Sequence, residues 1–444
     1  MIFSEWIRSV GFWALDYLRG SNIRRHYADI KYIMENQVSP DVTIMQERYL
    51  NDILKYATEN VEFYKKFKDY DSLKSFPVIN KNIIRNNFET FQAPEFLNAA
   101  VVTMHTSGST GMPFIARQDK NKRNRVYAEM IYFWGKAGYQ IGMKYIMFRT
   151  WTSLTRKNWL TAWARNILMI DVRSHDEKNL KNIRNILKSE KKIKTFIGYT
   201  SFLENLANYL LASGDTSEMY RNIHTIITNA EALPETTRRK LKGVFNCIIV
   251  SLYSNEENGI LAQECVENKE FHMNSASYHI ELLKIDSDNP AGVGEPGRIV
   301  VTDLFNHAMP LIRYDTGDTG TWRQEAECGW QSQVFSTVQG RLIDAIFNTK
   351  GENINSQSVD TLMYPFDNLL QFQFVQEGTK QFTLRLNGAE GHYEDATFVE
   401  LFKGFLGQDA EIVIEHVHEI PVMESGKRKF VVNNMPKEKH ELIG

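Results

Sequence analysis

A run of small and hydroxylated residues near position 110 has the composition of a phosphate-binding loop. Its candidate contacts are Thr106, Ser107, Gly108, Ser109, Thr110 and Gly111. Glycine lets a ligand approach the backbone closely, and free N–H groups and hydroxyls suit phosphate oxygens. A P-loop is excluded because Gly-Lys-Ser/Thr is missing, and the two glycines lack the dinucleotide-binding spacing. An ordinary Gly/Ser turn is the alternative for this loop taken alone.

The elements around this loop predict a layered α/β body. Residues 1–95 have the periodicity of helices, with a break near Pro77. Short apolar runs then alternate with amphipathic helical segments, and they predict strands at 144–150, 195–198, 225–228 and 247–252. Turn-rich residues 277–322 predict a β-rich subdomain that closes the body.

A smaller unit follows the body. A chain of 444 residues is longer than a domain with a single hydrophobic core usually is, so we expect a large domain and a smaller one. Strand candidates at 371–375, 382–386 and 411–416 predict a small α+β domain. We place the domains at 1–340 and 341–444.

Six segments occur in the order typical of acyl-adenylate-forming enzymes. After the loop come residues 229–233 (Asn-Ala-Glu-Ala-Leu), 251–257 (Ser-Leu-Tyr-Ser-Asn-Glu-Glu), 310–318 (Pro-Leu-Ile-Arg-Tyr-Asp-Thr-Gly-Asp), 340–344 (Gly-Arg-Leu-Ile-Asp) and 425–428 (Ser-Gly-Lys-Arg). The chain specifically resembles the phenylacetate-CoA ligase and capsular polysaccharide biosynthesis branch, in which the lysine after the loop proline is also absent. The resemblance implies a two-domain fold: an α/β body with a β-rich subdomain, and a small mobile C-terminal α+β lid.

The resemblance also assigns roles to individual residues. Nucleotide contacts fall to the loop, Ala230, Glu231, Tyr253, Ser254, Asp318 on the ribose, and Arg341 at the domain junction. The catalytic assignments are Lys427 for adenylation, Glu257 facing Mg²⁺, and Arg341. These groups suit the chemistry, because activating a carboxylate with ATP requires a neutralised triphosphate and a fixed nucleotide. Taken singly, Asp318 is more often a turn residue, Arg341 a surface ion pair and Glu257 a solvated residue.

Three positions depart from the family pattern. Ser254 replaces a glycine, and Glu256 replaces the Thr or Ser that contacts phosphate. Ile343 stands where many relatives have a hinge Asp or Lys, so we expect Asp344 or Gly340 to absorb the rotation.

A metal site of some relatives is present only in part. Cys265, His272 and Cys328 match three ligands, but Ala326 replaces the fourth. Structural zinc almost always has four ligands, so buried thiols and a packed histidine are the favoured interpretation.

The resemblance predicts an ATP-dependent ligase that forms an acyl-adenylate from a small carboxylic acid. The expected cofactors and cosubstrates are ATP, Mg²⁺ and, as acyl acceptor, coenzyme A. A sugar amine or hydroxyl is the alternative acceptor, which would make the enzyme an amide or ester synthase. A nucleotide-binding relative without catalysis is a further alternative. Among the nearby aromatic residues, Tyr199 is the best candidate to line an acyl pocket.

Composition argues against nucleic acid as a partner and favours the cytoplasm as the compartment. The 52 basic and 54 acidic residues nearly cancel, so nucleic acid is not an expected partner. Three cysteines are too few for a disulfide framework, which with no secretion signal favours the cytoplasm. Trp6, Val10, Trp13 and Tyr17 recur at helical spacing near the N-terminus. We expect this face to dock on the body, with contact to a membrane surface as the alternative.

Overall fold

The computed structural model describes residues 3–435 apart from 107–113, 152–154, 173–176, 325, 329, 331–332, 340–345, 352, 355–358, 360–361, 364, 367–368, 389–392 and 422–428.

The chain begins with the predicted helical region. Its elements are α1 (Phe3–Leu18), α2 (Asn22–Glu35), α3 (Pro40–Asn60), α4 (Lys81–Asn86) and the 3-10 turns η1 (Glu62–Phe67), η2 (Leu73–Ser75), η3 (Phe88–Phe91) and η4 (Pro94–Phe96). Asn80 caps α4, because its side chain accepts hydrogen bonds from the backbone N–H groups of Asn82 and Ile83. This cap fixes the start of α4 and the position of Lys81.

An eleven-stranded sheet forms the body within the described residues, in the order β10-β11-β12-β13-β9-β8-β7-β6-β5-β3-β4. Its parallel part contains β3 (Lys144–Arg149), β4 (Ile167–Asp171), β5 (Ile193–Tyr199), β6 (Thr225–Asn229) and β7 (Ile248–Asn255). The four strands predicted for this region are confirmed, and β4 is an additional strand at the edge. Helix α5 (Lys120–Lys136) precedes β3, and the helices between the parallel strands are α6 (Trp159–Ala164), α7 (Glu177–Ser189), α8 (Thr200–Ala212) and α9 (Glu235–Phe245), with the short turn η5 (Ser217–Tyr220).

The parallel strands carry apolar residues on both faces because both faces are covered. Phe196 of β5 and Ile226 of β6 pack with α7, α8 and α9, whereas the next residues, Ile197 and Ile227, pack with α2 and α5. Successive side chains of a strand point to opposite faces, so this burial explains the continuous apolar runs of the sequence.

The antiparallel part confirms the predicted β-rich region. It contains β8 (Gly259–Glu264), β9 (Phe271–Met273), β10 (Tyr278–Leu283), β11 (Pro296–Asp303), β12 (Tyr314–Arg323) and β13 (Val334–Gln339). A separate hairpin of β1 (Val102–Thr106) and β2 (Phe114–Gln118) flanks the glycine loop, with Thr106 opposite Phe114. The loop itself lies outside the described residues.

The C-terminal unit has the predicted α+β composition and its own core. Its elements are β14 (Ile346–Phe347), β15 (Asn353–Ile354), β16 (Gln371–Gln376), β17 (Gln381–Asn387), α11 (Asp395–Leu406), β18 (Glu411–His416) and β19 (Val431–Asn433). Four of the strands form a sheet in the order β18-β17-β16-β19, and Phe374, Phe382 and Phe402 are buried in its core. The predicted boundary at 340 and 341 falls outside the described residues and stays a prediction.

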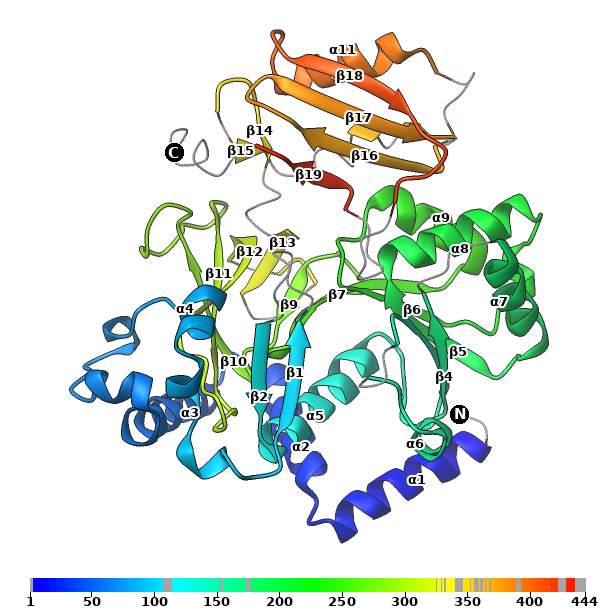
Figure 1. The fold of residues 1–444 in the computed structure, drawn as a ribbon. Coiled ribbons are helices and arrows are strands. Elements are labelled where there is room, and N and C mark those ends of the chain that lie inside the picture. The colour runs from blue at the N-terminus through cyan, green and yellow to red at the C-terminus, as the bar shows by residue number, and fades with distance from the viewer. Residues whose placement is uncertain are drawn as a thin grey trace.

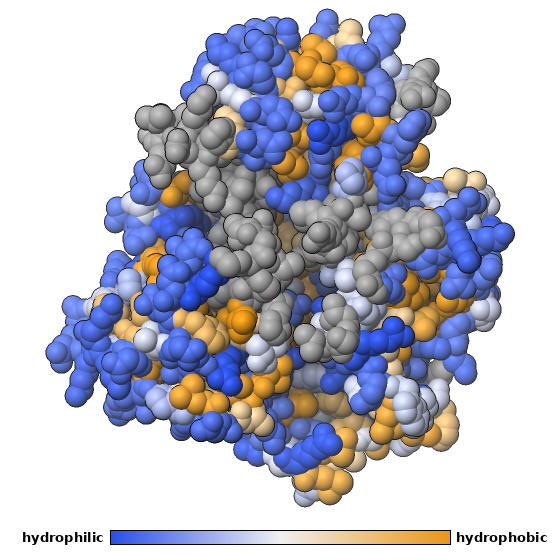
Figure 2. All heavy atoms as spheres, viewed as in Figure 1, coloured by the Kyte–Doolittle hydropathy of each residue, from blue (hydrophilic) through white to orange (hydrophobic). Residues whose placement is uncertain are grey.

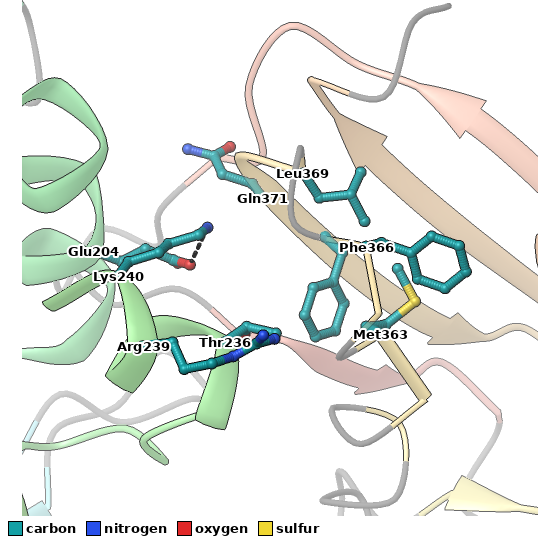
Figure 3. A pocket seen from close by; sticks show the side chains of 9 residues that line it. Glu204, Thr236, Arg239, Lys240, Met363, Phe366, Leu369 and Gln371 are labelled. Carbon is teal, nitrogen blue, oxygen red and sulfur yellow. Dashed lines mark hydrogen bonds and ion pairs between the residues drawn. The ribbon is translucent and has the colours of Figure 1, made fainter. Parts of the chain in front are cut away.

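The C-terminal unit lies over the body and contacts α8 and α9 (Figure 1). The Leu370 carbonyl accepts hydrogen bonds from Lys240 (2.9 Å) and Asn208 (3.1 Å), and the Gln371 amide donates to Asn205. A small cavity of about 60 Å³ lies at this contact, between Lys240 and Arg239 of α9 and Phe366 and Met363 of the C-terminal unit (Figure 3).

The orientation of α1 differs from the expected docking. Trp6, Val10 and Tyr17 are 54%, 46% and 72% exposed, so of the predicted apolar face only the half-buried Trp13 lies against the body, where it contacts Tyr27 of α2. The buried residues of α1 are instead Glu5 and Asp16. The reason is electrostatic, because the Glu5 carboxylate is paired with Lys194 at 3.0 Å. Among the described residues, no helix combines the length and the apolar character needed to cross a bilayer.

Candidate functional site

Most of the predicted site residues that the structure describes lie at one edge of the large sheet. Tyr199 of β5 is the register partner of Asn229 of β6, and Asn229 is the partner of Leu252 of β7. The residues directly after these positions, Ala230 and Tyr253, therefore lie near the carboxyl ends of adjacent parallel strands. This edge is where open α/β sheets bind ligands.

A close approach of two strands helps to place Tyr199. A side chain at Gly198 would put its Cβ 2.6 Å from the Cβ of Phe148 on β3 and 3.0 Å from the Phe148 carbonyl oxygen. Only glycine fits this position without a shift of the backbone. Tyr199 itself is half-buried, and burial raises the pKa of its hydroxyl. By contrast, Trp134, Phe148 and Trp151 are buried and do not line an open pocket.

Glu257 is buried in the turn between β7 and β8. One carboxylate oxygen, Oε1, accepts a hydrogen bond from the Tyr314 hydroxyl at 2.6 Å and lies 2.9 Å from the Lys81 ammonium. The other oxygen, Oε2, has no hydrogen-bond partner among the residues that the structure describes. A buried carboxylate oxygen left in this way is costly unless a cation or donor joins it. Burial and then Glu257 raise the pKa of Tyr314 well above its usual value, which keeps this tyrosine a donor.

The turn that carries Glu257 is tied to the hairpin that carries the glycine loop. The buried Gln118 side chain at the end of β2 donates to the Glu257 carbonyl at 2.8 Å and to the Glu256 carbonyl at 3.3 Å. Glu256, one of the departures from the family pattern, has its own partner, because its carboxylate lies 3.5 Å from Arg149. This side chain is thus held by a cation at the end of β3.

Asp318 is oriented by Tyr253. The Tyr253 hydroxyl donates to Asp318 Oδ2 at 2.9 Å and lies 3.3 Å from the Thr316 hydroxyl. Gly317, between Thr316 and Asp318, has a φ of +80°, a conformation that favours glycine. Burial, and then the Asp318 charge, raise the pKa of Tyr253 well above its usual value. The carboxylate of Asp318 is half-buried, so it remains within reach of a ligand.

Ala230 and Glu231 differ in what they offer to a ligand. Ala230 is exposed and has a φ of +67°, which is uncommon for a residue with a side chain and occurs often at binding sites. The Glu231 carboxylate accepts hydrogen bonds from the Ser201 backbone N–H (2.7 Å) and the Ser201 hydroxyl (3.0 Å). Glu231 therefore binds the first turn of α8, where a negative charge is favourable.

Several predicted residues cannot be placed. Arg341, Lys427 and residues 107–111 lie outside the described residues, and of Thr106 only the backbone is described. Conversely, the sequence did not indicate Lys81 or Gln118, although both contact the Glu257 turn. Lys81 follows the capping residue Asn80, but no spacing in the sequence connects it with Glu257. Tyr314 lies within a quoted motif, and its hydroxyl was not given a role.

A second cluster lies at the antiparallel part of the sheet. The ligand atoms of Cys265, His272 and Cys328 all lie within 4.8 Å of one another, with Cys328 Sγ 3.2 Å from His272 Nε2. Burial is the largest effect on the pKa of His272 and lowers it to about 4, so its imidazole is neutral at pH 7. The three side chains fit three positions of a tetrahedral zinc site, and Ala326 supplies no ligand atom.

We therefore expect the purified protein to carry less than one zinc per chain, because three ligands hold zinc more weakly than four. The Ala326→Cys variant should complete the set and carry stoichiometric zinc. The Ala326→Ser variant, whose hydroxyl is not a usual zinc ligand, is the matched control and should resemble the wild type. Elemental analysis of all three proteins measures this, and stoichiometric zinc in the wild type would contradict the expectation.

Comparison with known proteins relates these features to other chains. Residues 346–434 match the family described as the CapK C-terminal domain. Protein CapK from Staphylococcus aureus is 24% identical over 94% of each chain. A phenylacetate-coenzyme A ligase from Thermus thermophilus is 24% identical over 76% of this chain and 78% of its own.

The fold is shared with solved ligase structures. A 2-hydroxyisobutyryl-CoA ligase in its postadenylation state, in complex with an acyl-AMP, superposes with a TM-score of 0.72 at 15% identity and covers 91% of this chain and 92% of its own. The same ligase in its thioesterification state, with acyl-AMP and CoA, gives a TM-score of 0.57 and covers 88% of this chain and 90% of its own. The expected fold, an α/β body with a C-terminal unit, is confirmed.

Proposed function

We propose that this chain, a homologue of CapK and phenylacetate-CoA ligase with the fold of the adenylate-forming ligases, joins a carboxylic acid to coenzyme A. In the first half-reaction, a carboxylate oxygen attacks the α-phosphorus of ATP, acyl-AMP forms and pyrophosphate leaves. In the second, the CoA thiol attacks the acyl carbon, the thioester forms and AMP leaves. The three free cysteines, Cys247, Cys265 and Cys328, suit a reducing compartment such as the cytoplasm.

The observation that carries this proposal is the grouping of Ala230, Tyr253, Glu257 and Asp318 at one edge of the sheet. These four residues come from three segments that are far apart in the chain, yet the strand pairing and the Tyr253–Asp318 hydrogen bond bring them together. Polar groups that converge at the carboxyl ends of parallel strands form a nucleotide site in many α/β proteins.

Each group has a role that fits its surroundings. We assign the Asp318 carboxylate to the ribose hydroxyls, because Tyr253 fixes its orientation and it is not fully buried. We assign the exposed backbone at Ala230 to the adenine, since the Glu231 carboxylate is bound to α8. Tyr199 and Ser254 remain candidates for the acyl and phosphate sides of the site.

Glu257 is the residue that we assign to Mg²⁺. Its buried Oε2 suits a hard cation that takes few protein ligands, since Mg²⁺ is usually held by one or two carboxylates and the substrate phosphates. When bound, Mg²⁺ neutralises charge on the triphosphate. Lys81 and Tyr314 hold the other oxygen and so orient the carboxylate.

The arrangement of the two units supports a reaction in two conformations. The superposition is better with the postadenylation state of the solved ligase, at a TM-score of 0.72, than with its thioesterification state, at 0.57. We infer that the C-terminal unit rotates between the half-reactions, as lids do in many enzymes. The hydrogen bonds at Leu370 and Gln371 belong to the described arrangement and would break on rotation.

The test is pyrophosphate release from ATP with a panel of carboxylic acids, measured with and without CoA. We expect one class of acids to stimulate release and CoA to yield the thioester and AMP. Release without transfer to CoA, but with transfer to an amino sugar or a sugar hydroxyl, would assign the enzyme to amide or ester synthesis. Nucleotide binding without release for any acid would identify a non-catalytic relative.

A further inference from the structure

The N-terminal helix is held on the body by its polar side. Glu5 and Asp16, its two buried residues, are only 1% and 6% exposed. Glu5 is paired with Lys194, and Asp16 accepts hydrogen bonds from the backbone N–H groups at the start of α2. The helix backbone also packs directly on Gly142, where a Cβ would lie 2.1 Å from the Glu5 carbonyl oxygen. The polar side of α1 is thus held on the body, and of its apolar residues Phe12 and Trp13 contact Tyr127 and Tyr27.

Exposed apolar residues of α1 lie beside exposed apolar residues of α6, and we call the two groups together the tryptophan face. Its members and exposed fractions are Trp6 (54%), Ile7 (49%), Val10 (46%), Trp159 (78%), Leu160 (55%) and Trp163 (62%). Arg8 of α1 connects the two helices, because its guanidinium lies 4.7 Å from the Trp163 ring centre and donates to the Trp163 carbonyl. In Figure 1 α6 is seen nearly end-on just above α1 at the lower edge of the molecule, where Figure 2 shows apolar atoms among polar ones.

The exposed charges of the two segments that carry this face have a single sign. Residues 3–25 and 155–166 contain the basic residues Arg8, Arg19, Arg24, Arg25, Arg156, Lys157 and Arg165. Their two acidic residues are Glu5 and Asp16, and both are buried. The exposed charge in these segments is therefore entirely positive, although the whole chain is almost neutral.

We propose that the tryptophan face binds the surface of an anionic phospholipid bilayer, with α1 and α6 lying in the plane of the interface. Three observations carry this inference: the outward apolar side of α1, the three exposed tryptophans and the positive charge around them. Tryptophan is favoured at the boundary between headgroups and acyl chains. Basic side chains beside it are attracted to anionic lipids, and apolar side chains bury at the same depth.

A second copy of the chain fits this face less well. In a twofold dimer the same surface meets itself, so the arginines and lysines of one copy would face those of the other. Like charges brought together across an interface oppose association. An anionic lipid surface instead supplies the complementary charge.

The experiment is co-sedimentation of the full chain with vesicles of phosphatidylcholine alone and of phosphatidylcholine mixed with phosphatidylglycerol. We expect binding to the mixed vesicles, weakened by salt, and much less binding to phosphatidylcholine alone. The triple variant Trp6→Ser, Trp159→Ser, Trp163→Ser should lower the partition coefficient at least about tenfold, because three large apolar side chains are lost. The charge reversals Arg156→Glu and Lys157→Glu should remove most of the preference for the anionic vesicles.

The matched control removes three exposed apolar residues from other elements, namely Ile44, Val293 and Val413, which are 63%, 66% and 56% exposed. The Ile44→Ser, Val293→Ser, Val413→Ser variant should bind vesicles like the wild type. Unchanged thermal unfolding of both triple variants excludes a loss of fold. Equal binding by the wild type and the tryptophan variant, or no binding by the wild type, would overturn the proposal. So would a wild-type dimer in light scattering that the tryptophan variant does not form.

Discussion

Replacing Lys427 by alanine should lower the rate of acyl-adenylate formation by about a hundredfold, which corresponds to about 2.7 kcal/mol of transition-state stabilisation. A lysine ammonium is a compact charge that can contact the carboxylate and the α-phosphate oxygens as charge moves between them. Transfer of the acyl group from supplied acyl-AMP should stay within several fold of the wild type, because a rotated C-terminal unit would present a different face.

Residues that follow Lys427 in the chain lie in the C-terminal sheet. Residue 427 lies outside the described residues, but the chain is described again from Lys429, whose carbonyl accepts a hydrogen bond from Gln373. Strand β19 follows, pairs with β16, and is the edge strand of the C-terminal sheet on the side of the body (Figure 1). Strand β19, which begins four residues after Lys427, thus lies at the edge of the C-terminal unit that is nearer the body.

The control is Lys380→Ala, which removes an exposed lysine of the same unit that is paired with Asp409. This variant should retain both half-reactions. Equal losses in the two half-reactions of Lys427→Ala, with the circular dichroism spectrum unchanged, would contradict the two-conformation lid. No loss in either half-reaction would make Lys427 an ordinary surface residue.

The Glu257→Gln variant should reduce acid-dependent exchange of pyrophosphate into ATP at least about tenfold, a loss of more than about 1.4 kcal/mol. The amide keeps the size of the side chain and can still accept from Tyr314, but it lacks the charge that faces the metal. The magnesium concentration required for half-maximal exchange should rise as well. Titration of exchange against Mg²⁺ measures both effects.

The matched variant Lys81→Met separates metal binding from a structural role. Both substitutions remove the same ion pair, but only Glu257→Gln removes the carboxylate that we assign to Mg²⁺. We expect Lys81→Met to lower stability, since it leaves a buried carboxylate unpaired, while the magnesium dependence stays close to that of the wild type. The same shift in magnesium dependence in both variants would mean that Glu257 acts only through its ion pair.

The hydrophobic pattern of the sequence predicted the strands that are buried on both faces. The apolar runs of β3, β5, β6 and β7 identified the parallel strands, because a strand covered on both faces reads as continuously apolar. Strands β16, β17 and β18 were predicted as well, although β18 is mostly exposed. By contrast, β4 was not predicted. Its residues are mostly half-buried, since it lies at the edge of the sheet and has a neighbour on one side only.

The features that the sequence did not predict depend on contacts between distant residues. The amphipathic pattern of α1 was visible, but the side that docks is decided by the pairing of Glu5 with Lys194 and by the close approach at Gly142. Likewise, the motifs located Glu257 and Asp318, whereas Lys81 and Gln118 reach the site through the packing of α4 and the β1–β2 hairpin. The hydrophobic periodicity of a sequence does not indicate contacts between residues that are far apart in the chain.

Helix α8 connects the predicted nucleotide site to the C-terminal unit. Glu231, in the segment assigned to adenine, binds Ser201 in the first turn of this helix, and Asn205 and Asn208 in its middle contact Gln371 and Leu370. A 13-residue helix is about 20 Å long. A shift of the segment assigned to adenine would reach the hydrogen bonds of the C-terminal unit through α8, because Asn205 accepts from Gln371 and Asn208 donates to Leu370. In the proposed reaction, nucleotide binding and rotation of the C-terminal unit would therefore both act on one helix, whose stiffness comes from its backbone hydrogen bonds.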